Sequence, residues 1–237
     1  MKRRALWIVA ILAALLALAA LVWAGVLRPN RLIAARYPVK GVDISEYQGT
    51  VDWTRLSKGL DFAFVKATEG AGYADPCFSA NFQGARRAGL IAGAYHFFSF
   101  ESSGQAQAEN FIRAAGDLSG SLPPAVDVEL YGAFKRSPPS LPDVRARLDP
   151  LLRALEECYG VKPILYATGA AWSIYLKDAY QDYPLWIREV YLAPRATFLF
   201  WQYSDRGRLV GYDGPERFID LNVFNGSKEQ LAALALS

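Results

Sequence analysis

Short β-type runs alternate with helical stretches from residue 41 onwards, and this alternation restricts the chain to few folds. Strands are predicted at 41–45, 62–68, 90–98, 124–130, 163–168, 184–187, 198–204 and 217–224. Helices are predicted at 52–59, 76–89, 103–116 and 142–160. Such alternation favours a parallel β/α barrel or a doubly wound sheet. Because the second half carries fewer helices, we expect an irregular α/β barrel at the small end of the size range for TIM-like barrels.

The first residues form a different kind of segment. Residues 5–27 carry no charge and only Gly25 falls outside the apolar set, while Lys2, Arg3 and Arg4 precede them. A helix of this length spans roughly 35 Å, enough to cross a hydrocarbon core of about 30 Å. A buried core helix would normally show a polar stripe, which this segment lacks.

Two interpretations of this segment remain open, an uncleaved signal-anchor and a cleaved signal peptide of a secreted protein. Signal peptides usually have a shorter apolar core and a small-x-small cleavage site. The best candidate site, Val22-Trp23-Ala24, is poor because two of its residues are bulky. We therefore favour a transmembrane signal-anchor. The predicted organisation is a basic n-region at 1–4, the anchor at 5–27, a linker at 28–38 and a catalytic barrel at 39–237.

Composition is informative only once this segment is set aside. The chain is 52% hydrophobic with a net charge of +3, but Lys2, Arg3 and Arg4 account for that whole excess. The remainder is about 47% apolar, ordinary for a globular domain. It shows no clustered basic face with interleaved aromatics, so we expect no nucleic-acid partner.

Four carboxylates lie near predicted strand ends: Asp43 on the first strand, Asp127 and Glu129 on the fourth, and Asp220 on the last. Residues i and i+2 of a strand share a face, so Asp127 and Glu129 project together. Polar groups at the C-terminal strand ends of a barrel are typical of catalytic sites, and a closed barrel makes its first and last strands neighbours.

Buried carboxylates are costly, and glycoside hydrolysis is one chemistry that needs them. It uses an acid with a raised pKa beside a carboxylate that stays ionised. The pattern alone is weak, however. An Asp-x-Glu triplet occurs about once by chance in a chain of average acid content, and Asp43 or Asp220 could equally be a cap or turn residue.

At these residues the chain strongly resembles the glycoside hydrolase family 25 lysozymes, the Chalaropsis-type N-acetylmuramidases. The resemblance runs from residue 41 to about 224 and rests on GVDISEYQG, FAFVKATEG, GAYHFF, PAVDVEL, LWI, FWQYS and IDLNVF, in that order. It implies an irregular β/α barrel whose last strands lack helices. It also implies cleavage of the β-1,4 bond between N-acetylmuramic acid and N-acetylglucosamine in peptidoglycan.

The resemblance assigns roles to individual residues. Glu129 matches the general acid, Asp127 the aspartate beside it, and Asp43 and Asp220 the first-strand and last-strand carboxylates. Tyr95 matches a tyrosine at the sugar-cleaving subsite. Further predicted glycan contacts are Trp186, Trp201 and Gln202, although buried aromatics are more often core. After LWI, where the family commonly has Ala and an aromatic, this chain has Arg188 and Glu189.

The chemistry leaves three routes open. An ionised Asp127 would raise the pKa of Glu129 and keep it protonated. The 2-acetamido group of the substrate could then attack with Asp127 orienting it, Asp43 could attack directly, or water could attack with inversion. The distance between the carboxyl groups would help to choose.

Other sites are predicted to be structural. His96, the only histidine, is expected to be a hydrogen-bonding residue of the barrel interior. Cys77 and Cys158 are expected to remain unpaired, because they lie at ends of helices that are not neighbours. We expect no metal and no cofactor, since ligand spacing is missing. Lys66 and Glu69 are explained equally well by a structural ion pair or by catalysis.

The prediction is therefore a monomeric muramidase, anchored in the cytoplasmic membrane or exported, whose barrel faces peptidoglycan outside the cytoplasm. One alternative is a non-catalytic peptidoglycan-binding barrel. Another is an Asp-x-Glu-type hydrolase of a different N-acetylated glycan.

Overall fold

The computed structural model describes residues 2–24 and 26–237, and its centre is a closed barrel. The strands are β1 (Val39–Ile44), β2 (Phe62–Glu69), β3 (Tyr73–Ala74), β4 (Ile91–Phe97), β5 (Ala125–Val128), β6 (Ile164–Thr168), β7 (Leu185–Arg188), β8 (Phe200–Gly207) and β9 (Ile219–Phe224). They follow the order β1-β9-β8-β7-β6-β5-β4-β2-β3, and an additional β1–β2 pairing closes the ring. The short β3 pairs only with β2, outside the ring. The predicted irregular barrel is confirmed.

Strand direction departs from the parallel expectation at one place. Strand β9 runs antiparallel to both of its neighbours, β1 and β8. The other pairings within the ring are parallel. In the β1–β9 register Asp43 lies directly opposite Asp220, so closure brings the first and last carboxylates together.

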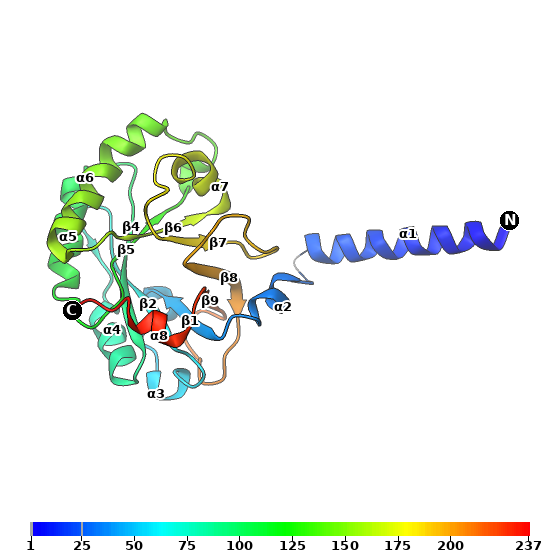
Figure 1. Ribbon diagram of the computed structural model, residues 1–237, viewed down its shortest axis with the longest axis horizontal. Coiled ribbons are helices and arrows are strands. Elements are labelled where there is room, and N and C mark those ends of the chain that lie inside the picture. The colour runs from blue at the N-terminus through cyan, green and yellow to red at the C-terminus, as the bar shows by residue number, and fades with distance from the viewer. Residues whose placement is uncertain (1, 25) are drawn as a thin grey trace.

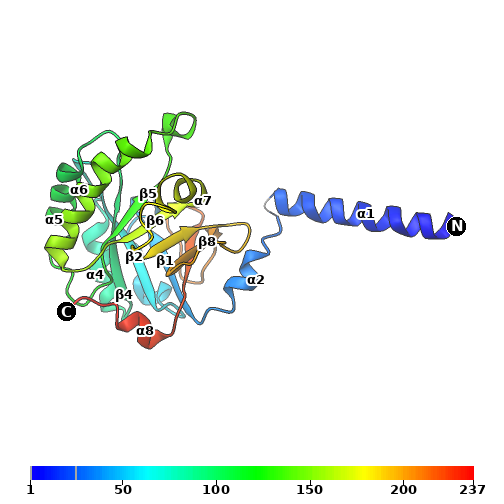
Figure 2. The ribbon, with the colours of Figure 1, turned by 45° about the horizontal axis from the view of Figure 1, so that its top comes forward.

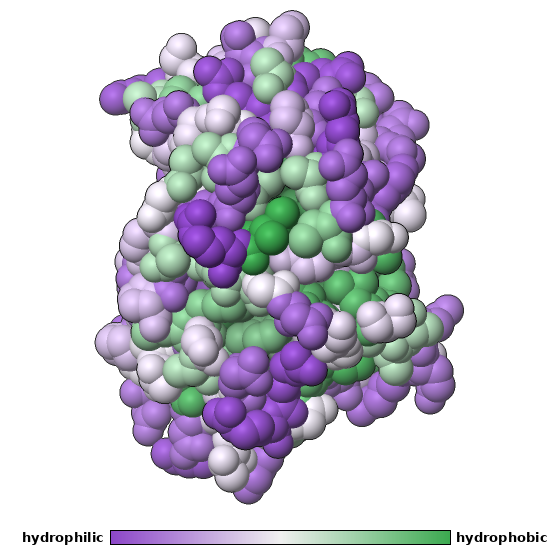
Figure 3. Space-filling view, turned by 90° about the vertical axis from the view of Figure 1, so that its left-hand side faces the viewer, coloured by the Kyte–Doolittle hydropathy of each residue, from purple (hydrophilic) through white to green (hydrophobic). Residues whose placement is uncertain are grey.

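Helices cover the barrel unevenly, as Figures 1 and 2 show. One side carries α4 (Phe78–Arg87), α5 (Gly104–Ala115) and α6 (Leu141–Tyr159), with α3 (Trp53–Leu56) nearby. Strands β6 and β7 are joined by the short pieces α7 (Gly169–Ala171) and η3 (Trp172–Leu176), and the short α8 (Lys228–Ala232) follows the last strand. Short turns η1 (Glu46–Gln48) and η2 (Gly132–Lys135) complete the barrel elements. The face opposite the N-terminal helix carries mostly hydrophilic side chains at its two ends and a hydrophobic band between them (Figure 3).

Helix ends follow local chemistry. The Asp52 side chain accepts hydrogen bonds from the backbone N–H groups of Thr54 and Arg55 and so caps α3. Gly160 ends α6 with φ 72°, a left-handed conformation that favours glycine.

The core has two layers because side chains alternate along each strand. An inner cluster inside the barrel includes Phe62, Phe64, Ala125 and Phe200. An outer cluster lies between strands and helices and includes Val126 and Val128 together with helix residues. Asp127 lies between these two valines in sequence, so it points inward.

The N-terminal part consists of α1 (Lys2–Trp23) and α2 (Asn30–Ala34). The helical segment 3–22 is long and apolar enough to cross a membrane, and the described side chains of α1 are nearly all exposed. Helix α2 lies against β8 (Figures 1 and 2). The buried Asn30 amide donates to the backbone carbonyls of Tyr203 and Glu189. The segment predicted as a linker therefore includes a helix docked on the barrel, and the domain boundary at 38/39 stays a prediction.

Candidate active site

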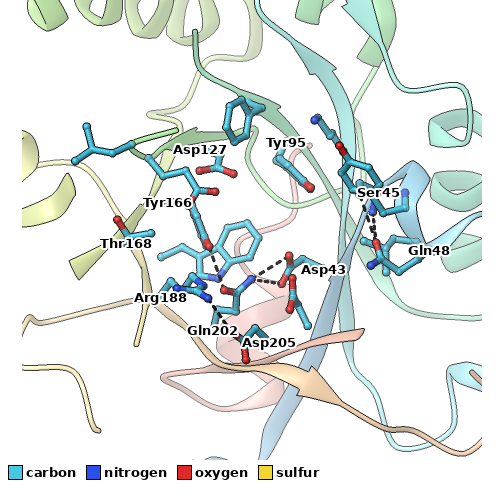
Figure 4. A pocket seen from close by; sticks show the side chains of 18 of the residues that line it. Asp43, Ser45, Gln48, Tyr95, Asp127, Tyr166, Thr168, Arg188, Gln202 and Asp205 are labelled. Carbon is cyan, nitrogen blue, oxygen red and sulfur yellow. Dashed lines mark hydrogen bonds and ion pairs between the residues drawn. The ribbon is translucent and has the colours of Figure 1, made fainter. Parts of the chain in front are cut away.

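A cavity of about 610 Å³ opens at the C-terminal ends of the parallel strands. Figure 4 shows the side chains that line it converging from opposite sides of the barrel. All four predicted catalytic carboxylates line this cavity, together with Tyr95, Trp186 and Gln202; they are Asp43, Asp127, Glu129 and Asp220. Seven of the eight predicted site residues are thus brought together.

Asp43 is held by a network of amide donors. Gln202 Nε2 lies 2.9 Å from Asp43 Oδ1 and 3.1 Å from Oδ2, and Asn222 Nδ2 lies 2.6 Å from Oδ1. Tyr166 donates to Gln202 Oε1 at 3.0 Å, and Trp186 Nε1 donates to Asn222 Oδ1 at 2.8 Å, so both amides present their NH₂ groups to Asp43. Burial raises the pKa of Asp43, while these donors oppose the rise by stabilising its carboxylate.

Asp220 is the neutral partner of Asp43. Burial, followed by the charge of Asp43, raises the pKa of Asp220 to about 9. At neutral pH Asp220 is therefore protonated, and the pair carries one negative charge, which the amides place on Asp43.

Asp127 is the least satisfied carboxyl of the cleft. Its exposed fraction is 7%, and its Oδ1 atom is buried with no hydrogen-bond partner among the described residues. Burial, followed by the charge of Glu129, raises the pKa of Asp127 well above its ordinary value. A buried carboxylate without a hydrogen-bond donor is costly, so burial favours the protonated form of Asp127.

Glu129, just beyond the end of β5, is less buried than Asp127. Burial raises the pKa of Glu129, while the positive charges of Arg188 and Lys135 lower it. The structure thus differs from the expected arrangement, in which an ionised Asp127 keeps the proton on Glu129. Burial raises both pKa values, and the deeper burial of Asp127 favours a proton on Asp127 rather than on Glu129.

Arg188 introduces a positive charge into this acidic cleft. Its Nη2 atom lies 2.9 Å from Asp205 Oδ2, and the other oxygen of Asp205 lies 2.6 Å from Arg28 Nη1. A second cation at the cavity, Lys66, pairs with Glu69 at 2.6 Å and lies over the Phe97 ring. This contact supports the interpretation of Lys66 and Glu69 as a structural ion pair.

The predicted aromatic contacts separate into two groups. Tyr95 lines the cavity, and Trp186 is 2% exposed and stacks on Phe64 with ring centroids 4.3 Å apart, so it forms the floor. Trp201 does not line the cavity. It is fully buried on the other side of β8, where its Nε1 donates to the Glu189 carbonyl, because its neighbour Gln202 takes the inward position.

The remaining candidates lie outside the cleft. His96 is buried and bonds to Thr68 Oγ1 at 2.7 Å and to Gln107 of α5 at 3.0 Å, and burial lowers its pKa to about 4. It is a hydrogen-bonding residue as expected, but it faces α5 rather than the barrel interior. Cys77 and Cys158 are free thiols. Within residues 2–24 and 26–237, no cluster of three His, Cys, Asp or Glu side chains is suited to a metal.

Sequence reasoning missed two residues that line the cleft, Tyr166 and Asp205, and also the buried Asn222, which donates to Asp43. The alternation of side chains along a strand, together with the pairing of neighbouring strands, could have indicated two of these three residues. Asn222 is two residues after Asp220 on β9, and Tyr166 lies opposite Asp127 in the β5–β6 register. Asp205 had no such signal, because its role depends on Arg28, far away in sequence.

Comparisons with known proteins agree with this geometry. The family model described as "Glycosyl hydrolases family 25" matches residues 42–212. A solved family 25 glycosyl hydrolase from Bacillus anthracis is 46% identical with a TM-score of 0.80, covering 85% of this chain and 95% of that one. The protein YegX of Escherichia coli (strain K12) is 37% identical over 85% of this chain and 75% of its own length. Lysozyme M1 of Streptomyces globisporus is 34% identical over 83% of this chain and 71% of its own.

Proposed function

The chain belongs to glycosyl hydrolase family 25, and we propose that its four cleft carboxylates carry out the reaction of a lysozyme. The protein is a glycoside hydrolase that acts on peptidoglycan. The bond cleaved is the β-1,4 linkage between N-acetylmuramic acid and N-acetylglucosamine. The observation that carries the assignment of residues is the convergence of Asp43, Asp127, Glu129 and Asp220 on one cavity.

Glu129 is the general acid in this mechanism. It is less buried than Asp127, and burial raises its pKa, which favours the protonated form that a general acid needs. It protonates the glycosidic oxygen as the bond to the sugar C1 breaks.

Asp127 orients the 2-acetamido group of the substrate. Its carboxyl lines the cavity and has no donor among the described residues, so the acetamido N–H supplies the missing hydrogen bond. That bond stabilises the Asp127 carboxylate, which moves the shared proton toward Glu129 when substrate binds. The amide oxygen then attacks C1, and water later opens the cyclic intermediate with Glu129 acting as base.

Asp43 is a stabiliser rather than a nucleophile. Its oxygens already accept three hydrogen bonds from Gln202 and Asn222, which reduce its nucleophilicity and fix its position. The single negative charge of the Asp43–Asp220 pair, held on Asp43, stabilises the positive charge that develops on the sugar ring.

We further propose that the protein acts as a monomer held by α1 in the cytoplasmic membrane, with the barrel outside the cytoplasm. Support comes from the apolar, exposed α1 and from the location of peptidoglycan. N-terminal sequencing of the protein isolated from cells tests this proposal. Retention of residues 1–24 is expected, and a mature chain that begins near residue 25 would mean secretion instead.

The nature of the cleaved bond is tested by its products. Purified peptidoglycan is digested with the full chain, and the new reducing ends are reduced with borohydride and identified by mass spectrometry. Reduced N-acetylmuramic acid is expected. Reduced N-acetylglucosamine, or faster release from a chitin-like glycan, would overturn the assignment.

A further inference from the structure

A second cavity, of about 400 Å³, lies between the end of the N-terminal segment and the β8–β9 hairpin, apart from the catalytic cleft. Its lining is unusual in composition: four of the seven lining residues are arginines and none is acidic. They are Val26, Arg28, Arg31, Arg206, Arg208, Phe218 and Leu221. We call this cavity the arginine pocket.

Among the residues that the structure describes, Arg31, Arg206 and Arg208 of the arginine pocket form no ion pair. Arg28 pairs with Asp205, which it shares with Arg188. Arg31 donates to neutral acceptors, Ser204 Oγ at 3.1 Å and the Arg206 carbonyl at 2.9 Å, so it keeps its full charge.

The hairpin side of the pocket adds further charge. Arg208 and Arg217 both lie over the Phe218 ring. Their guanidinium carbons are 5.4 Å and 5.2 Å, respectively, from the ring centroid. Arg206 and Arg208 are exposed, so their guanidinium groups are accessible to a ligand. The pocket therefore combines fixed cations with an apolar wall of Val26, Phe218 and Leu221.

This combination matches a phosphate group that carries an apolar chain. Guanidinium groups present planar forks of N–H donors, which suit phosphate oxygens. Val26 and Arg28 follow closely after α1, which ends at Trp23, so the pocket lies where a membrane-spanning α1 would leave the hydrocarbon core. Lipid headgroups occupy that layer of a bilayer.

We propose that the arginine pocket binds the phosphate of an anionic lipid headgroup in the leaflet where α1 ends. The lipid would hold α2 and the β8–β9 hairpin against the membrane surface. This binding site is independent of the hydrolytic reaction, because Arg206 and Arg208 do not line the catalytic cleft.

Thermal unfolding of the full chain in a zwitterionic detergent tests the proposal, because a ligand of the folded state raises the melting temperature. The probes are short-chain phosphatidylglycerol, short-chain phosphatidylcholine and inorganic phosphate, added at equal ionic strength. Phosphatidylglycerol is expected to raise the melting temperature in a saturable way, and phosphatidylcholine to have no effect. A comparable rise with inorganic phosphate would contradict the proposed lipid ligand, because the apolar wall would then contribute nothing to binding.

Paired variants decide whether the effect belongs to the arginine pocket. In the double variant Arg206→Gln/Arg208→Gln, we expect at least a tenfold increase in the phosphatidylglycerol concentration that gives half of the maximal rise in melting temperature. The matched control, Arg36→Gln/Arg195→Gln, removes two exposed arginines that do not line the pocket and is expected to respond like wild type. No response in wild type, or an unchanged response in Arg206→Gln/Arg208→Gln, would overturn the proposal.

Discussion

At the scale of single residues, the cleft is an arrangement of unequal carboxyl groups. Asp43 has its hydrogen bonds satisfied, Asp220 is neutral at pH 7, and Asp127 has an oxygen without a partner. These differences follow from neighbouring donors and from burial rather than from the residue types themselves. They separate a stabilising role for Asp43 from an orienting role for Asp127.

Asp127→Asn tests the orienting role. The amide keeps the shape of the side chain but loses the charge that aligns the acetamido N–H, so we expect kcat to fall by roughly 10²-fold or more while KM changes little. Steady-state kinetics on a soluble peptidoglycan fragment measure both values. Asp182→Asn, an exposed acid of the Lys162 pair, is the control and should keep wild-type activity. A KM effect alone would mean that Asp127 only binds substrate.

Arg188→Gln tests how the cleft sets the pH range of activity. The Arg188 charge lowers the pKa of Glu129, so its removal raises that pKa. Because the general acid must be protonated, activity is lost as pH rises through the pKa of Glu129, and this alkaline limb should move to higher pH in the variant. The pH profile of kcat measures the shift. The control Lys162→Gln, at an exposed ion pair, should leave the profile in place. A shift to lower pH in Arg188→Gln would contradict the proposed influence on Glu129.

At the scale of elements, local patterns predicted the ring strands because each contains a short run rich in apolar residues. Both ends of α6 also followed local signals, since Ser140 caps it and Gly160 stops it. The antiparallel direction of β9 was not predictable, because it depends on closure of the ring between β1 and β8. Helix α2 is five residues long and is held mainly by contacts with β8, which no local pattern reveals.

Asn30→Ala tests whether α2 is part of the folded barrel. The Asn30 amide is buried and bonds to two carbonyls, on Glu189 and Tyr203, so its loss should lower the free energy of unfolding by about 1–3 kcal/mol. Urea unfolding of the full chain measures this change. Arg36→Ala, at an exposed position just after α2, should change stability by less than about 0.5 kcal/mol. Equal stability of Asn30→Ala and wild type would mean that α2 is a dispensable linker.

At the scale of the whole molecule, two parts of different chemistry share one chain. The apolar excess and the net charge of +3 arise from the N-terminal segment, whereas the barrel carries its function in a few buried carboxylates. The sequence was enough to predict the barrel and the four acids, because both depend on ordered motifs. The roles of Arg28 and Asp205 required the folded chain, since each contacts residues that are distant in sequence.

The most direct measurement compares wild type with Glu129→Gln for release of N-acetylmuramic acid reducing ends from purified peptidoglycan. The variant keeps the size of the side chain but has no proton to donate, so a rate loss of about 10²–10⁴-fold is expected, with glycan binding and melting temperature unchanged. Equal rates for the two proteins would contradict the assignment of Glu129 as the general acid. Binding without hydrolysis by both proteins would mean that the barrel only recognises peptidoglycan.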